Sequence, residues 1–247
     1  MLPFLKNHPF SVEAFFENTY VLTFAVPKEE LQGHIPECLE LDTFNDQWAF
    51  ITLALVQTKG LRPKGFPAIL GDDFFLIGYR IFVKYINTKG KRLRGLYILK
   101  SETNNKKMEV LGNIFTHYNY TTTDITEIKG VERNEISSNQ SNFKVVFQNC
   151  NEHEESLPEH SPFSKWKDAR RFSGPLPFTF TYDETTHKVL IIEGVREDWN
   201  PRPIKIIDYE VSFFEKFSFT TIQLASSFVI KDIPYYWKKG KIEEWKQ

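Results

Sequence analysis

The chain has 247 residues, of which 41% are hydrophobic and 15% are aromatic, including 23 phenylalanines. This much apolar surface excludes a largely disordered protein, and because β-rich chains of this length commonly form one domain, we expect a single domain over 1–247. The 31 basic and 32 acidic residues give a net charge of -1, which excludes a strong overall field toward nucleic acid or an anionic membrane surface. We expect neither as a partner.

The cysteine content and the N-terminus indicate a cytoplasmic protein. Cys38 and Cys150 are too few for a disulfide framework or a zinc cluster, and they suit a reducing compartment. Prolines and polar residues interrupt the stretch 1–16 before an apolar run forms, so it does not predict a signal peptide. No stretch approaches the roughly 20 apolar residues of a membrane-spanning helix.

The first part of the chain predicts strands joined by short connections. "TYVLTFAV" (19–26) is rich in β-branched and aromatic residues and stops at Pro27, which can open a short helix that ends at Pro36. "LELDTF" and "WAFITLALV" flank the dipeptide 45–46, Asn-Asp, which is typical of a tight hairpin turn. The stretch 58–73 holds three glycines and two prolines and predicts a loop.

The next predicted hairpin places an arginine in an apolar row. "FFLIGYRIFVKYI" (74–86) and "GLYILKSE" (95–102) surround the basic turn "NTKGKRLR". Alternation puts Arg80 on one face with other residues that are mostly apolar. A guanidinium there needs a protein carboxylate, such as Glu102 or Glu109, an anionic ligand group, or a path to solvent.

Two further stretches carry polar candidates. Alternation predicts that Lys100 and Glu102 share a face with Ile98, either lining a cavity or at the solvated end of the strand. "EVLGNIFTHYNY" (109–120) predicts a strand in which His117 is either a wall residue or an acid–base group. The candidate ligand-binding residues are therefore Arg80, Glu102, Glu109, His117 and Tyr118.

The middle of the chain is polar. The stretch 121–142 predicts short edge elements and loops, and "FKVVFQN" (143–149) predicts a strand. The charged stretch 150–171 predicts a surface insertion. Its metal-ligating residue types match the spacing of no closed metal motif, so we expect a solvated acidic loop and no metal site. These residues are Cys150, His153, Glu154, Glu155, Glu159 and His160.

The last part of the chain predicts a hairpin and further strands. "PFTFTY" and "KVLIIEGV" flank the turn 183–187, and alternating runs continue toward the C-terminus. Many short strands and few helices predict a mainly β (α+β) fold, a closed or nearly closed antiparallel β-barrel, because closure removes exposed edges. The sequence has no phosphate-binding, dinucleotide-binding, nucleophile-elbow or zinc-protease motif, so we expect no cofactor.

The order of several segments resembles a known group of proteins. "VPKEELQGHIPECLELDTFNDQWAFITLALV", "GLRPKGFPAI", "GYRIFVKY", "GLYILKSE" and the closing "SSFVIKDIPYYWKKGKIE" resemble the YqjF-like group of uncharacterised bacterial proteins, in the acetoacetate decarboxylase-like superfamily. The resemblance implies a closed, mainly antiparallel β-barrel with short outer helices and an internal small-molecule pocket. Relatives commonly carry an acidic residue and an asparagine where this chain has Leu76 and Gly78, whereas the arginine is retained as Arg80.

The resemblance also bears on chemistry. Decarboxylases of the superfamily use a lysine that forms a Schiff base, beside a second cation that lowers its pKa. This pair follows a glycine and two further residues, and if the glycine is Gly112, the pair falls on Phe115 and Thr116. Neither side chain can form an imine, so the resemblance implies that Schiff-base decarboxylation is absent.

Three hypotheses for function follow. The first is a barrel that binds a small organic acid or carbonyl compound without the imine-forming lysine. The second is an enzyme with other acid–base chemistry in the same pocket, using His117, Glu102 or Glu109. The third is a protein-interaction module that uses the insertion 150–171.

Overall fold

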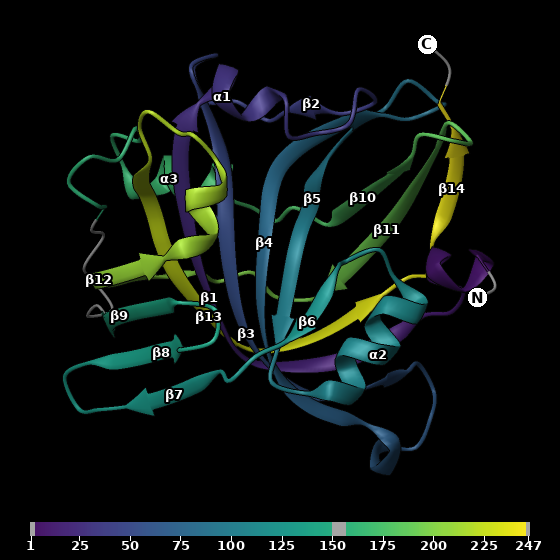
Figure 1. Ribbon diagram of the computed structural model, residues 1–247, viewed down its shortest axis with the longest axis horizontal. Coiled ribbons are helices and arrows are strands. Elements are labelled where there is room, and N and C mark those ends of the chain that lie inside the picture. The colour runs from purple at the N-terminus through teal and green to yellow at the C-terminus, as the bar shows by residue number, and fades with distance from the viewer. Residues whose placement is uncertain (1–2, 150–156, 246–247) are drawn as a thin grey trace.

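The computed structural model describes residues 3–149 and 157–245 (Figure 1). Within these residues, fourteen strands join into one hydrogen-bonded network. The first seven are β1 (Val12–Pro27), β2 (Glu40–Leu41), β3 (Trp48–Pro63), β4 (Asp72–Ile86), β5 (Arg92–Thr103), β6 (Tyr120–Thr122) and β7 (Thr126–Lys129). The others are β8 (Asn134–Ser138), β9 (Phe143–Asn149), β10 (Phe178–Asp183), β11 (Lys188–Arg196), β12 (Arg202–Val211), β13 (Gln223–Trp237) and β14 (Lys241–Glu244).

The helices in the described part of the chain are short. The α-helices are α1 (Lys28–Gln32), α2 (Lys106–Phe115) and α3 (Trp166–Phe172), and three 3-10 helices cover Pro3–Asn7, Ala68–Leu70 and Ser212–Lys216. None of these helices is long and apolar enough to cross a membrane.

Hydrogen bonds close seven of the strands into a ring. The order β11-β10-β5-β4-β3-β1-β13 returns to its start because β13 also pairs with β11. All of these pairs are antiparallel except the parallel pair of β5 and β10. The predicted closed, mainly antiparallel β fold is therefore confirmed, although the ring carries additional strands and is not a simple barrel.

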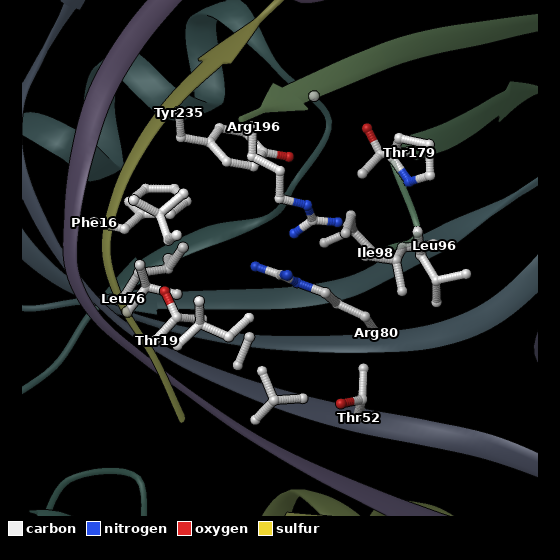
Figure 2. A pocket seen from close by; sticks show the side chains of 18 of the residues that line it. Phe16, Thr19, Thr52, Leu76, Arg80, Leu96, Ile98, Thr179, Arg196 and Tyr235 are labelled. Atoms are coloured by element: carbon white, nitrogen blue, oxygen red, sulfur yellow. The ribbon is translucent and has the colours of Figure 1, made fainter. Parts of the chain in front are cut away.

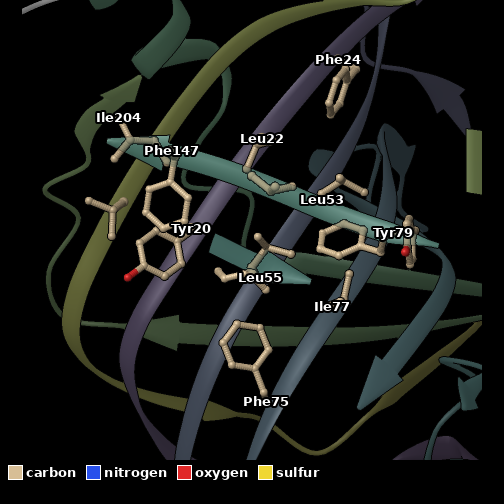
Figure 3. Packing of buried hydrophobic residues seen from close by; sticks show 14 of the residues in the cluster. Tyr20, Leu22, Phe24, Leu53, Leu55, Phe75, Ile77, Tyr79, Phe147 and Ile204 are labelled. Carbon is tan, nitrogen blue, oxygen red and sulfur yellow. The ribbon is translucent and has the colours of Figure 1, made fainter. Parts of the chain in front are cut away.

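A second small sheet covers the outside of the ring. Strands β7, β8, β9 and most of β12 pair with one another (Figure 1) and pack against the outer faces of β1, β3 and β4. Figure 3 shows side chains of these three strands facing those of the small sheet. The fully or almost fully buried members of this core include Leu22, Phe24, Leu53, Leu55, Ile77, Ile136, Phe147 and Ile204.

The inner faces of the same strands border the interior of the ring. Along β4, Ile77 and Tyr79 point outward into the core, whereas Leu76, Arg80 and Phe82 point inward. The alternation predicted for this strand is confirmed. Both of its faces are covered, so the inward side chains are remote from the outer surface.

One irregularity changes which residues of β5 point inward. Tyr79 pairs with Lys100, but Arg80 pairs with Ile98, so Leu99 is an extra residue in the ladder. Such a β-bulge reverses the alternation beyond it. Ser101 therefore lines the interior, while Lys100 and Glu102 turn to the outer side. The prediction that Glu102 shares a face with Ile98 was wrong.

The predicted strand at 109–120 was also wrong in its first part. Residues 106–115 form α2, because the Asn105 side chain caps the first turn by accepting a hydrogen bond from the Met108 amide, and Met108 and Gly112 are buried one turn apart. Only Tyr120–Thr122 is a strand, parallel to β5. His117 lies in the connection between the two.

Other predicted connections agree with the structure in part. The φ angles of Asn45 and Asp46 are both 54°, as a tight turn requires, and Phe44 and Trp48 pair across it. The strand before this turn is only Glu40–Leu41 and pairs with β4 instead of β3. Part of the predicted loop 58–73 is strand, because β3 continues to Pro63.

The stretch 150–171 has a mixed character. Residues 150–156, with Cys150 and His153, lie outside the described residues, and so do Glu154 and Glu155. The remainder, expected to be solvated, contributes buried side chains to a core with Phe50 and Phe228. These are Phe163, Trp166 and Ala169.

Truncating a buried side chain in the core between the ring and the small sheet should lower the stability of the protein substantially. Leu53 is fully buried there, so Leu53→Ala should lower the free energy of unfolding by about 2–5 kcal/mol. Urea denaturation measures this change. Ile128→Ala, at a side chain that is 62% exposed, is the control and should change stability by less than about 0.5 kcal/mol. Equal effects of the two substitutions would contradict this assignment of the core.

Candidate functional site

The interior of the ring contains a cavity of about 130 Å³. Strands β1, β3, β4, β5, β10, β11 and β13 all contribute to its walls, which are mostly aliphatic and aromatic. Among the described residues that line it, the only charged ones are Arg80 and Arg196. A largely apolar cavity with a few polar groups is the usual character of a small-molecule site.

Arg80 enters the cavity from β4, where a glycine makes room for it. A Cβ atom at Gly78 would lie 2.8 Å from both Nε and Nη2 of Arg80, which is closer than real contacts allow. The guanidinium therefore lies against the bare backbone of its own strand. Part of the side chain borders the open space of the cavity, so Arg80 is partly buried.

Arg196 enters from another wall, at the end of β11. It pairs with Tyr235 in the ladder that closes the ring. Its guanidinium carbon lies 4.2 Å from the centre of the Trp199 ring and 5.8 Å from that of Tyr235, distances at which the aromatic faces attract a cation. Figure 2 shows the guanidinium groups of Arg80 and Arg196 directed toward one another across the cavity.

Neither arginine has a carboxylate partner among the described residues. Arg62 and Arg94, by contrast, form ion pairs with acidic side chains at 2.7 Å and 2.6 Å. The Nε atoms of Arg80 and Arg196 are buried without any hydrogen-bond acceptor in the described chain. Two like charges thus face each other inside the ring, with no acidic side chain among the described residues that line the cavity.

Burial lowers the pKa of Arg80, and burial together with the charge of Arg80 lowers the pKa of Arg196. The pKa of a guanidinium starts so high that both groups remain charged near neutral pH. A buried charge without a partner is unfavourable by several kcal/mol. The arrangement therefore favours an anion between the two groups.

Other side chains add hydrogen-bond donors to the same cavity. Thr19 Oγ1 and Trp199 Nε1 are buried without a partner in the described residues. The hydroxyls of Tyr118 and Thr179 lie 2.7 Å apart, and burial raises the pKa of Tyr118 to about 12, so this phenol is protonated at neutral pH. The cavity thus presents donors to a ligand that carries acceptors.

Glu102 does not join this site. Its side chain is 2% exposed on the other side of β5, where it accepts a hydrogen bond from the Tyr79 hydroxyl at 2.9 Å and pairs with Lys100 at 2.5 Å. Glu102 therefore neutralises Lys100, and the ion pair with Arg80, one of the alternatives that the sequence left open, is not formed.

Glu109 and His117 also lie away from the cavity. Glu109 is in the first turn of α2 and forms an ion pair with Lys106 at 2.8 Å. His117 is half-buried, and burial, aided by the charge of Lys6, lowers its pKa. Of the five candidates, the structure brings together only Arg80 and Tyr118.

Sequence reasoning missed Arg196 and Trp199. A local signal was present, because both arginines belong to a Gly-x-Arg triplet within a strand, at 78–80 and 194–196. In each triplet the glycine lies on the inward face, two residues before the arginine. The second glycine also leaves room for an aromatic ring, since a Cβ at Gly194 would lie 1.8 Å from the Tyr235 hydroxyl.

The chain matches one protein family over most of its length. The model of the family DUF2071, described as "Uncharacterized conserved protein (COG2071)", matches residues 13–241. No curated protein matches the chain.

Solved structures share the fold at low sequence identity. Acetoacetate decarboxylase from Legionella pneumophila is 10% identical, with a TM-score of 0.60 over 95% of this chain and 88% of that one. An acetoacetate decarboxylase-like enzyme from Sphingomonas wittichii is 10% identical, with a TM-score of 0.57 over 97% and 94%. The enduracididine biosynthesis enzyme MppR complexed with pyruvate is 10% identical, with a TM-score of 0.53 over 95% and 90%. At this identity the likeness shows the fold alone.

The unpaired charge of Arg80 predicts a substitution that stabilises the protein. Arg80→Met removes the charge and keeps a similar apolar volume, so in the absence of ligand it should raise the free energy of unfolding by about 1–2 kcal/mol. Urea denaturation of the ligand-free protein measures the change.

The matched control is an arginine that has a partner. Arg94→Met leaves the buried Asp42 with only Lys84, at 3.8 Å, and should lower the free energy of unfolding by about 1–3 kcal/mol. If Arg80→Met destabilised the protein as much as Arg94→Met, the charge of Arg80 would be compensated within the folded chain.

Proposed function

We propose that this chain, which belongs to the DUF2071 family, binds a small organic acid whose carboxylate lies between Arg80 and Arg196. The observation that carries the proposal is that the two guanidinium groups face one another in an interior cavity whose described lining contains no carboxylate. A carboxylate offers two oxygens, each able to accept hydrogen bonds from a guanidinium, and its charge offsets part of theirs.

The size of the cavity limits the group bound beside the arginines. A cavity of about 150 Å³ in another protein holds benzene, so about 130 Å³ suits a group of roughly five to seven non-hydrogen atoms. A neutral carbonyl compound of that size fits the space but leaves both charges uncompensated. The charge therefore favours an acid over a neutral carbonyl compound.

The proposal contains no imine-forming step. No lysine is among the described residues that line the cavity. The acid–base alternative that uses His117, Glu102 or Glu109 gains no support either, because none of the three lines it. MppR, which shares the fold, forms a complex with pyruvate, so a short 2-oxo acid is a reasonable probe for this chain. As part of the same proposal we place the protein in the cytoplasm, given its two cysteines.

Calorimetric titration tests the carboxylate site. Propionate and pyruvate should bind, and propionamide, which has the same shape as propionate without the charge, should bind at least tenfold more weakly. Arg80→Met and Arg196→Met should each weaken propionate binding by about 10- to 150-fold, the range expected for the loss of a charged hydrogen bond.

Arg92→Met provides the control because it removes the same charge from an exposed position at the start of β5. It should leave the dissociation constant for propionate within twofold of that of the unmodified protein. Equal affinity for propionate and propionamide, or binding that is indifferent to both interior substitutions, would refute the proposal.

A further inference from the structure

A second cavity of about 230 Å³ lies next to the ring cavity. It is bounded by α2, by the ends of β1, β3 and β4, and by the segment around Leu70. Most of its surface comes from apolar side chains. These include Phe10, Leu61, Phe74, Met108, Leu111 and Phe115.

The two cavities share a wall. Phe16, Leu76, Tyr118, Tyr120 and Trp237 line both of them, so a single layer of side chains separates the two spaces. In Figure 2, Phe16 and Leu76 lie on the side of the ring cavity toward which the Arg80 guanidinium extends. A molecule that is held by Arg80 and reaches the second cavity would have to pass between these side chains.

The charges of the second cavity are already balanced. Arg62 pairs with Glu13 at 2.7 Å, and Lys107 pairs with Asp72 at 2.9 Å. Unlike the ring cavity, this space has no uncompensated charge among the described residues that line it. It is suited to an uncharged, largely apolar group.

Two neutral polar atoms in the second cavity still need a partner. His8 Nε2 and Thr58 Oγ1 are buried without a hydrogen bond in the described chain. Burial lowers the pKa of His8 to about 4, so its ring is uncharged near neutral pH. A hydrocarbon group cannot hydrogen-bond to either atom, so water must satisfy them when such a group occupies the rest of the cavity.

We infer that the two cavities bind one amphipathic acid, with its carboxylate between the arginines and its apolar chain in the second cavity. The inference rests on the function proposed above and narrows it to acids with a medium-length aliphatic chain. The ring cavity alone is too small for such a chain, and the second cavity alone offers no unpaired cation to the carboxylate.

Titration with acids of increasing length tests the inference. Each methylene that enters an apolar cavity should tighten binding about fourfold, so octanoate should bind at least about 100-fold more tightly than propionate. Leu111→Trp fills the second cavity from α2, and Leu70→Trp fills it from the short helix between β3 and β4, where the native side chain is already 55% exposed. Either substitution should weaken octanoate binding at least tenfold and leave propionate binding within twofold.

Val110→Trp is the control, since Val110 is on the same helix but is 50% exposed and does not line the cavity. It should change the affinity for neither acid. Arg80→Met should weaken the binding of both acids.

The outcomes separate the two proposals. If propionate binds and octanoate binds no more tightly, or if the advantage of octanoate survives both tryptophan substitutions, the inference about the chain is wrong and the carboxylate site stands. If neither acid binds the unmodified protein, the carboxylate site itself is wrong and the inference falls with it. Leu70→Trp keeps the test decisive if Leu111→Trp fails to fold.

Discussion

Arg80 and Arg196 bring two positive charges into a cavity whose described lining contains no acidic side chain. Their repulsion and their separation from water both oppose folding, so the surrounding structure must hold them in place. The aromatic faces of Trp199 and Tyr235 offset part of this unfavourable free energy for Arg196. The absence of a side chain at Gly78 leaves room for the guanidinium of Arg80. The part of the positive charge that remains uncompensated favours the binding of an anion in the cavity.

The double burial of the long strands supplies the stability that such a site requires. Strands β1, β3 and β4 pack their outer faces into a core with the small sheet, while their inner faces form the cavity. The outer core is closely packed around fully buried side chains such as Leu22 and Leu53. Because the two faces alternate residue by residue, the side chains that stabilise the fold and those that form the site occupy the same strands without competing for position.

The sequence predicted the fold and the site best in segments where the inward and outward side chains alternate without interruption. The 74–86 strand keeps its alternation, so the sequence placed Arg80 correctly on the same face as Leu76 and Phe82. The 95–102 strand loses its alternation at Leu99, which is an extra residue in the ladder. Its amino-acid composition gives no sign of this bulge, so the sequence did not predict it. The segment at 106–115 has valine, isoleucine and phenylalanine, which favour a strand, whereas the Asn105 cap and the burial of Met108 one turn before Gly112 favour a helix. Arg196 was missed because its partner arginine is distant in sequence and only the ring brings them together.

The bulge at Leu99 decides which side chains of β5 line the cavity. With uninterrupted alternation, Lys100 and Glu102 would point inward beside Ile98, and Glu102 would be available to neutralise Arg80. The extra residue instead turns Glu102 to the outer side, where the Tyr79 hydroxyl and Lys100 satisfy it, and brings the uncharged Ser101 inward. Bulges are frequent beside functional sites because one inserted residue redirects every side chain that follows it. Here the redirection keeps the mutually paired Lys100 and Glu102 out of the cavity, so the cavity holds no carboxylate from β5 that could contact Arg80.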